Sequence, residues 1–542
     1  MVKMKSLAVG VSLVALTAVV LGACGGKNAE NDGGKDFSIA DRYKLDKTKP
    51  AWELDKKEEP TTLTWYLNSD WKTIPFGDDV TTAQIKKDLN IDVKFITGDD
   101  TKLNTMFSGG DMPDIVTLFD PTSSAAKKAN TWAYPLDDLA KKYDPYFKSV
   151  TYDQTFKWYQ LDDGKTYGYP NYSNTQEDYD SGVIPVNTNF IIRQDIYEAL
   201  GKPSVATQAE FENVMNQIKE KYPELTPFGF SPLGDSTGSL GEPLQDWLGV
   251  PLEKDGKFYD RNLDKDYLSW VKTLNKVYRD GNISDDSFAD DGPTFDEKIK
   301  SGKYATLFIN GTSGLVPQLQ TFSNNNKGNA YMAIDGPKST LGNEPTLNQT
   351  GISGWLVNYI TKDAKDPAKA IQLFTYLLDK KGQILTRYGV EGETYQYNQD
   401  GKIEFLPEVL KLKEDNPVEY SEKYRISEFL YFNHDRNNAL GVGSTDASVN
   451  QMQEWGKGKL KPHFIIENTN PDAGTPEARS FDGIKTKWST ALVGMIRSKD
   501  DAGFDKKLAD YKTFLKENNW DKIEKVRNEK MKENKEKLET KD

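Results

Sequence analysis

The spacing of apolar residues changes twice near the start of the folded part of the chain, and this change constrains the fold most. Residues 63–67 alternate as in a strand, residues 80–89 recur at helical spacing, and residues 91–95 alternate again. A further apolar run, 115–119, follows a turn rich in Gly and Asp. A strand, helix and strand in this order indicate parallel strands covered by helices. The sequence therefore predicts an α/β fold.

Helix boundaries are marked clearly further along the chain. Thr207 and Glu210 form a capping box before an apolar face, and Asp366-Pro367 is a cap followed by proline at the first helical position. Residues 504–526 continue a helical pattern towards a charged end. A chain of 542 residues with this many elements predicts two or more domains.

The first residues have the pattern of an export signal. Lys3 and Lys5 precede an apolar run over 7–21, which is shorter than a membrane span usually is. Leu-Gly-Ala-Cys at 21–24 resembles a lipobox, and Cys24 is the only cysteine. We expect a lipoprotein signal peptide at 1–23, lipidation with palmitate at Cys24 and a flexible tether at 24–58. An ordinary signal with an incidental cysteine is the alternative.

Composition excludes some classes of function. The net charge of −13 argues against binding to the nucleic-acid backbone. With one cysteine, the body has no disulfide, and its length allows a core large enough without one. Aromatic residues make up 11% of the chain and include eleven tryptophans, some of which could stack on a ligand.

Several short motifs occur in a recognisable order. They are Leu-Thr-Trp-Tyr-Leu-Asn at 63–68, Gly-Asp-Met-Pro-Asp-Ile-Val at 110–116, Trp-Ala-Tyr-Pro-Leu-Asp-Asp-Leu at 132–139, Gly-Lys-Thr-Tyr-Gly-Tyr-Pro at 164–170, Ile-Ile-Arg-Gln-Asp-Ile at 191–196 and Gly-Lys-Tyr-Ala-Thr-Leu-Phe-Ile-Asn-Gly at 302–311. In this order the chain resembles extracellular solute-binding proteins of ABC importers, the family that contains maltose-binding proteins and longer Gram-positive lipoproteins.

The resemblance implies a two-lobed, periplasmic-binding-protein-like fold with discontinuous α/β lobes and a hinge. We expect the chain to cross between lobes near 183–189, near Asn310 and near 351–355. The expected boundaries are 59–184 and 311–352 for lobe 1, and 185–310 and 353–542 for lobe 2.

The resemblance also implies a function. It predicts a non-enzymatic, monomeric receptor on the extracellular face of the membrane that delivers an oligosaccharide to an ABC permease. We expect it to bind no nucleic acid and no cofactor. A surface-anchored glycoside hydrolase remains an alternative, because two suitably placed carboxylates are easily found among 83 acidic residues. A peptide-binding or adhesive lipoprotein is a further alternative.

Polar residues that follow predicted strands are the first candidates for the ligand site. In maltose-binding proteins the polar residues after the first strand touch sugar, which by resemblance points to Asn68, Asp70 and Trp71. Other predicted strand and turn ends contribute the further candidates Asp120, Asn171 and Tyr172. The alternative is a set of turns in which these side chains only cap backbone groups.

Candidates near the crossing segments are Trp247, Asn310 and Trp355, of which Trp355 is the strongest. The alternative for each tryptophan is packing in a core.

Two later segments add three more candidates. By resemblance, the loop at 388–395 reaches the ligand and contributes Glu391 and Tyr395. Arg436 could clamp the carboxylate of a uronic acid, or form a surface ion pair instead.

The sequence gives little support for catalysis by a serine or histidine or for metal binding. Residues 234–238 match G-x-S-x-G, but they follow a loop rich in Pro and Gly rather than a buried strand. The chain has only His434 and His463, which nearly excludes histidine-based catalysis or metal binding. Longer members of the resembling family often carry a calcium loop after the helix that matches 211–222. Here Tyr-Pro-Glu-Leu-Thr-Pro follows at 222–227, so we expect no metal.

Overall fold

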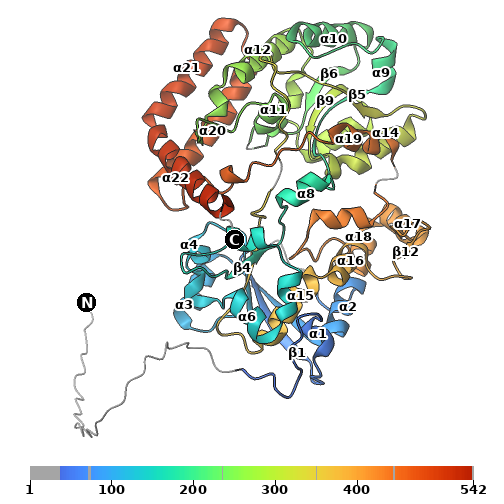
Figure 1. Cartoon of the computed structure of the whole chain (residues 1–542). Helices are drawn as coiled ribbons and strands as arrows, with labels where there is room; N and C mark the ends of the chain where they lie inside the picture. Colours follow the sequence, from blue (N-terminus) through green and yellow to red (C-terminus); the bar gives the residue numbers. More distant parts are fainter. Residues whose placement is uncertain (1–36, 71–74, 235, 349–350, 444–445, 540–542) are drawn as a thin grey trace, which may run out of the picture. The chain divides into compact units, whose positions relative to one another are not determined.

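The computed structural model describes residues 37–70, 75–234, 236–348, 351–443 and 446–539. Cys24, the expected signal peptide and the first part of the expected tether lie outside these ranges, as does Trp71. Within the described residues, two mixed sheets each carry helices and form two α/β lobes, which confirms the predicted fold class (Figure 1).

A five-stranded sheet in the order β2-β1-β3-β11-β4 is the centre of the first lobe. The strands β1, β2 and β3 are parallel, as the sequence predicts, and β11 is antiparallel to both β3 and β4. Helix α15 is buried along its whole length and packs against α1, α2 and α6.

The elements of the first lobe are α1 (Ala51–Leu54), β1 (Thr61–Leu67), α2 (Val80–Leu89), β2 (Ile91–Thr97), α3 (Asp100–Gly109), β3 (Ile115–Leu118), α4 (Ser124–Lys127), α5 (Ala129–Trp132), α6 (Leu136–Tyr143), η1 (Pro145–Ser149), α7 (Asp153–Trp158), β4 (Gly168–Pro170), β11 (Val357–Ile360), α15 (Pro367–Leu378), α16 (Lys380–Tyr388), β12 (Tyr395–Tyr397), β13 (Ile403–Phe405), α17 (Pro407–Asp415), α18 (Pro417–Tyr424) and η6 (Asp435–Leu440).

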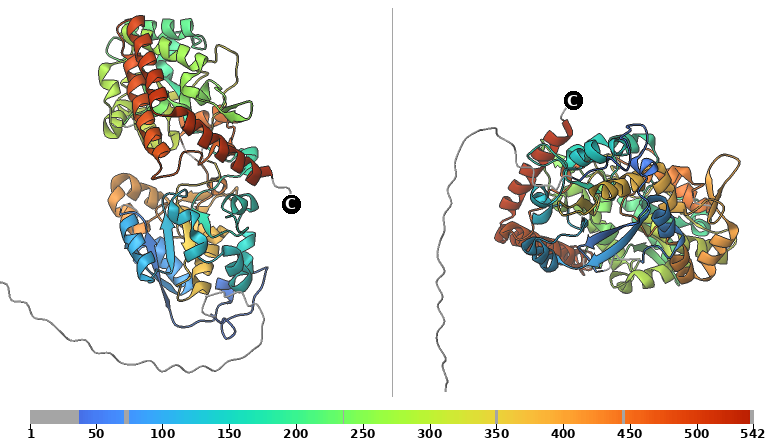
Figure 2. Two further views of the ribbon diagram at one scale, coloured as in Figure 1. Left: turned by 90° about the vertical axis from the view of Figure 1, so that its left-hand side faces the viewer. Right: turned by 90° about the horizontal axis from the view of Figure 1, so that it is seen from below.

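A four-stranded sheet in the order β10-β5-β9-β6 is the centre of the second lobe. Strand β5 is antiparallel to β9 and β10, whereas β6 and β9 are parallel. Helix α10 packs against β6 and α12, and its predicted capping box between Thr207 and Glu210 is present. Helices α20 and α21 lie side by side (Figure 2).

The elements of the second lobe are β5 (Thr188–Arg193), α9 (Gln194–Ala199), α10 (Gln208–Lys221), β6 (Thr226–Phe230), η2 (Gly238–Leu240), α11 (Glu242–Trp247), β7 (Glu253–Lys254), β8 (Lys257–Phe258), η3 (Arg261–Leu263), α12 (Lys265–Arg279), η4 (Asp285–Phe288), α13 (Gly292–Lys300), β9 (Tyr304–Asn310), η5 (Thr312–Leu315), α14 (Val316–Asn325), β10 (Tyr331–Ala333), α19 (Ala447–Gly456), η7 (Phe464–Ile466), α20 (Pro476–Ile496), α21 (Asp501–Glu517) and α22 (Trp520–Glu539).

Strand pairing corrects two of the expected lobe boundaries. Strand β10 pairs with β5, so residues 311–333 belong to the second lobe, and Asn310 is not a crossing point. Strand β11 pairs with β3, so the expected lobe 2 segment 353–542 begins in the first lobe instead. The reason is that apolar spacing predicts a strand but does not say which strand it pairs with.

Three segments cross between the lobes. The first runs from β4 to β5 and contains α8 (Gln176–Ser181), and the second runs from β10 to β11. The third lies between η6 and α19, where the sequence analysis expects none. A further contact comes from α22, which packs against α7; there Lys537 donates to the Trp158 carbonyl at 3.5 Å.

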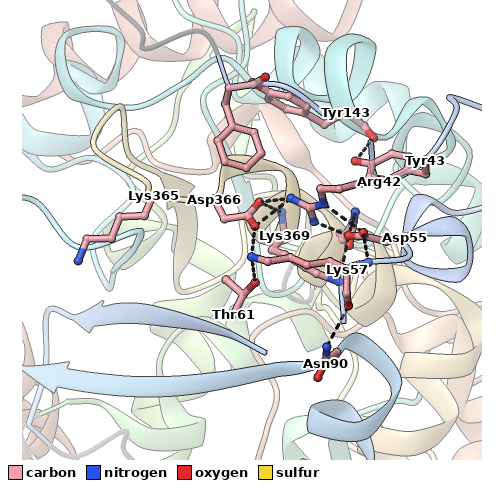
Figure 3. Close-up of polar contacts among 12 residues, drawn as sticks. Arg42, Tyr43, Asp55, Lys57, Thr61, Asn90, Tyr143, Lys365, Asp366 and Lys369 are labelled. Atoms are coloured by element: carbon pink, nitrogen blue, oxygen red, sulfur yellow. Dashed lines mark hydrogen bonds and ion pairs between the residues drawn. The ribbon is translucent and has the colours of Figure 1, made fainter. Parts of the chain in front are cut away.

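Residues 37–58 are part of the fold, which corrects the expected tether at 24–58. Phe37, Ile39 and Trp52 pack against the core of the first lobe. Arg42 donates to both carboxylate oxygens of Asp366, at 3.0 and 2.9 Å. The same guanidinium contacts Asp55, so this segment is held by an ion cluster that also contains Lys57 and Lys369 (Figure 3).

Candidate functional site

Strand register brings several predicted site residues to one edge of the first sheet. Val357 lies opposite both Leu118 and Pro170, so the residues after β3, after β4 and before β11 meet at this edge. Strand β1 runs parallel to β3 and ends at the same edge. We call this the strand-end edge, and the predicted residues on it are Asn68, Asp120, Asn171, Tyr172 and Trp355.

Trp355 is held at the strand-end edge with its side chain exposed. Its exposed fraction is 41%, and its ring centre lies 5.8 Å from that of Phe119. The buried amide oxygen of Asn171 accepts from the backbone N–H of Trp355 at 3.3 Å and of Leu356 at 3.2 Å. Gly354 precedes it with φ +59°, a conformation that glycine adopts at little cost. The ring is therefore presented by a fixed backbone.

The acidic and amide groups at the edge make local contacts. Asp120 accepts from the backbone and the hydroxyl of Thr122 at 2.8 and 2.7 Å, which is the turn-capping arrangement. Asn68 donates to Asp100 at 2.6 Å, and Asp70 is exposed. Asp70 and Asp120 are exposed and follow strands that end at the strand-end edge. Both carboxylates therefore remain candidates for contact with a ligand.

Tyr172 forms a polar cluster that no sequence pattern predicts. Its hydroxyl donates to Asp435, and Asn174 donates to both, at 3.1 Å to Tyr172 and 3.2 Å to Asp435. Burial, followed by the charge of Asp435, raises the pKa of Tyr172 well above its usual value. Asp435 is 263 positions away in sequence, so no local pattern connects the two residues.

Arg436 forms the ion pair that was the alternative to a carboxylate clamp. Its Nε donates to Asp178 at 2.6 Å, and its guanidinium lies 4.0 Å from the ring centre of Tyr152. The ion-pair alternative describes it better, although the partner is buried: Asp178 is 2% exposed and completes the capping box of α8. This pair joins the first crossing segment to η6.

Trp247 and Tyr395 are core residues, so both predictions are corrected. Trp247 is 2% exposed and stacks on Trp455, with ring centres 4.7 Å apart and planes 11° apart. Tyr395 is buried beside Tyr388. Glu391 is exposed in the turn before β12 and bridges to Tyr395. An aromatic-rich pattern alone does not separate core from site.

A cavity of about 740 Å³ lies in the second lobe. Its walls come from η2, α11, β8, η3, α20 and α22, with Thr188 and Asn310 at one side. These two residues face each other at the start of β5 and the end of β9, and Thr188 donates to Asn310 at 3.1 Å. Asn310 is therefore a predicted site residue that lines a large cavity. We call this the second-lobe cavity.

Two carboxyl groups of the second-lobe cavity are unusual. Asp246 pairs with Arg261 at 2.7 Å, yet burial raises its pKa to about 7. Burial raises the pKa of Asp260 to about 6. No sequence pattern predicts either group, because the walls of the cavity come from segments more than 200 residues apart and only the fold brings them together.

The described ranges hold no group of three or more His, Cys, Asp or Glu side chains that could bind a metal ion. His434 is buried, and burial lowers its pKa to about 4. Ser236 of the G-x-S-x-G match donates to the Leu233 carbonyl. None of the helices in the described part has the length and apolar character needed to span a membrane.

Two α/β lobes joined by three crossing segments define a class: the chain has the fold of the extracellular solute-binding proteins of ABC importers, as the sequence motifs suggest. An HMO-binding solute-binding protein from Bifidobacterium longum infantis superposes with a TM-score of 0.64 at 13% identity, over 88% of this chain and 99% of that one. The alginate-binding protein AlgQ2 gives 0.61 at 17% identity, over 88% and 99%. At these identities the likeness establishes the fold.

A sequence relative is the lipoprotein LipO of Bacillus subtilis, which is 23% identical over 312 residues. The match covers 54% of this chain and 59% of LipO, so the chain spans less than two thirds of that relative's length. No protein-family model matches the sequence.

Proposed function

We propose that this chain is the lipid-anchored, extracellular substrate-binding subunit of an ABC importer and that it captures an oligosaccharide between its lobes. The observation that carries the proposal is Trp355, an aromatic side chain that is 41% exposed at the strand-end edge. Sugar rings present flat C–H faces to such aromatic groups. An alginate-binding protein and an HMO-binding protein have the same fold, which supports a carbohydrate as the ligand class.

The chemistry around Trp355 suits the capture of a sugar. Asp70 and Asp120 offer exposed carboxylates that can accept from hydroxyl groups, and Asn68 lies at the end of the neighbouring strand. A polar ligand enclosed between two lobes loses its water to these fixed groups, and closing the hinge around it creates a shape that a permease can recognise. The protein in this proposal is a monomer that delivers its ligand without chemical change.

The anchor in the proposal is Cys24. A receptor outside the cell has to stay close to its permease, and one acyl chain binds a membrane only weakly. The proposal therefore includes a multiply acylated cysteine, with palmitate among its chains. The relative LipO is described as a lipoprotein, which supports this part.

Replacement of Trp355 with Ala tests the ligand site. We expect this change to weaken binding of the retained oligosaccharide by about 1–3 kcal/mol, the loss typical of one aromatic stacking contact. Ligands are first found by a thermal-shift screen of oligosaccharides, since a bound ligand raises the melting temperature. Titration calorimetry then compares the wild-type protein with the variant.

Tyr397→Ala is the matched control, because Tyr397 is 45% exposed but lies in the β12–β13 hairpin. We expect it to leave affinity unchanged. If Trp355→Ala folds normally and binds as tightly as the wild-type protein, the strand-end edge is not the site. If only peptides raise the melting temperature, the ligand class is wrong.

A surface glycoside hydrolase is the second candidate, and one observation favours it. Asp246 and Asp260 line the same cavity with raised pKa values, as a catalytic acid requires. Against it, Asp246 is already engaged by Arg261. Mass spectrometry of oligosaccharides after incubation with the protein separates the two: intact sugar supports capture, and shortened products support hydrolysis.

A further inference from the structure

Two charged side chains on the second-lobe cavity keep an unsatisfied atom. Among the described residues, the Nε of Arg527 and one carboxylate oxygen of Asp260 are buried without a hydrogen-bond partner. A buried polar atom without a partner destabilises the fold, and more so when the group is charged. One donor and one acceptor on the same cavity therefore both lack a partner.

Aromatic rings hold the Arg527 guanidinium against the cavity wall. The guanidinium lies 3.8 Å from the ring centre of Phe258 and 5.4 Å from that of Phe481. Trp520 packs edge-on against Phe258 with ring centres 6.1 Å apart. Arg527 forms no ion pair within the described residues; its one hydrogen bond there goes to the Thr469 hydroxyl at 3.3 Å.

The charges that line the second-lobe cavity nearly cancel. Four carboxyl groups face three basic groups, and two of the four have raised pKa values. An anionic ligand would satisfy Arg527 but meet these carboxyl groups, and a cationic ligand would meet the three basic groups. The acids are Glu242, Asp246, Asp260 and Asp482, and the bases are Arg261, Lys485 and Arg527. The cavity wall favours a ligand without net charge.

We infer that the second-lobe cavity is a subsite for uncharged sugar units, in which Arg527 donates to hydroxyl oxygens, Asp260 accepts from hydroxyl groups, and Trp520 supplies an apolar face. Each sugar hydroxyl is both a donor and an acceptor, so one ligand satisfies both unpaired atoms. At about 740 Å³ the cavity is within the range that encloses drug-sized ligands, so it has room for more than one sugar unit. This inference rests on the proposed function and specifies its substrate as a neutral oligosaccharide.

Calorimetry with the full-length protein tests the inference. The probes are neutral malto-, cello-, xylo- and fructo-oligosaccharides, together with uronic-acid and amino-sugar oligosaccharides of the same lengths. We expect the wild-type protein to prefer a neutral probe. Trp520→Ala and Arg527→Lys each lower affinity for that probe about tenfold or more, because the first removes a stacking face and the second removes the planar fork.

Lys525→Met on the same helix is the control, since the Lys525 side chain is 77% exposed, and we expect unchanged affinity. Melting temperatures show whether each variant folds. If Arg527→Lys does not fold, the affinity of Trp520→Ala tests the inference. Unchanged affinity in a folded Trp520→Ala, or a wild-type preference for charged probes, overturns the inference. If no saccharide binds the wild-type protein, the proposed function itself fails. If Trp355→Ala weakens binding but the cavity variants do not, only the subsite is lost.

Discussion

Replacing Asp55 with Asn is expected to lower the free energy of unfolding by about 3–5 kcal/mol, as measured by urea denaturation. The Asp55 side chain is fully buried between two cations: Arg42 donates to it through Nε at 3.0 Å, and the ammonium of Lys369 lies 3.1 Å away. Lys369 is itself only 3% exposed. Without the carboxylate, both cations lose a charged partner inside the fold.

The control for Asp55 is Asp92→Asn, which removes an exposed pair with Lys86. We expect a loss below about 1 kcal/mol there. A similar small loss for Asp55→Asn would mean that the ion cluster holds residues 37–58 only weakly. Proteolysis reports the same contact, since residues 37–58 become accessible if the cluster no longer holds them.

The contribution of Asp55 also has a predicted dependence on pH. Burial alone would raise the pKa of Asp55, but the hydrogen bond from Arg42 and the charge of Lys369 hold it well below its usual range. A carboxyl group with a lowered pKa stabilises the fold above its unfolded pKa. This stability is lost as the pH falls from about 4 towards the folded value.

Asp144 is expected to have the opposite effect to Asp55 on the pH dependence of the free energy of unfolding, and Asp144→Asn tests this. Asp144 is fully buried; one oxygen accepts from the Ala51 N–H at 3.1 Å, the other has no partner among the described residues, and burial raises the pKa to about 6. The wild-type protein therefore loses stability as the pH rises from about 4 to 6. Asparagine keeps the acceptor without the charge. The stability of the variant relative to wild type should grow by about 2.5 kcal/mol between pH 4 and pH 8.

Urea denaturation of both proteins at the two pH values checks this prediction. Comparing the difference at each pH removes any constant cost of fitting the amide into the site. If the difference is the same at pH 4 and pH 8, the carboxyl of Asp144 does not titrate as its burial implies.

Local patterns predicted much of the fold. The alternation at 63–67 and 91–95 became the parallel pair β1 and β2, and the cap at Asp366 begins α15 as expected. These signals depend on neighbours within a few residues. Residues 37–58 were misjudged because their polar composition is typical of a linker. The partner that orders Arg42 is Asp366, 324 positions later, and no local rule relates the two.

The candidate site shows the same limit. Trp247 and Trp355 are chemically identical and were both predicted near crossing segments, yet one stacks in a core and the other is exposed. What distinguishes them is a third residue in each case: Trp455 covers Trp247, whereas Asn171 fixes the backbone at Trp355. Asn171 was predicted as a ligand contact, but its side chain is buried and its amide oxygen fixes the backbone at the strand-end edge.

Because of the ion cluster at Arg42, a force applied at residue 37 is transmitted differently to the two lobes. A pull at residue 37 passes through Arg42, Asp55 and Asp366 directly into α15, the buried helix of the first lobe. It reaches the second lobe through the crossing segments, the contact of α22 with α7 and the ion pair between Lys127 and Asp472. A surface that holds the protein by its N-terminal side therefore immobilises the first lobe, and the second lobe becomes the part that is left to move.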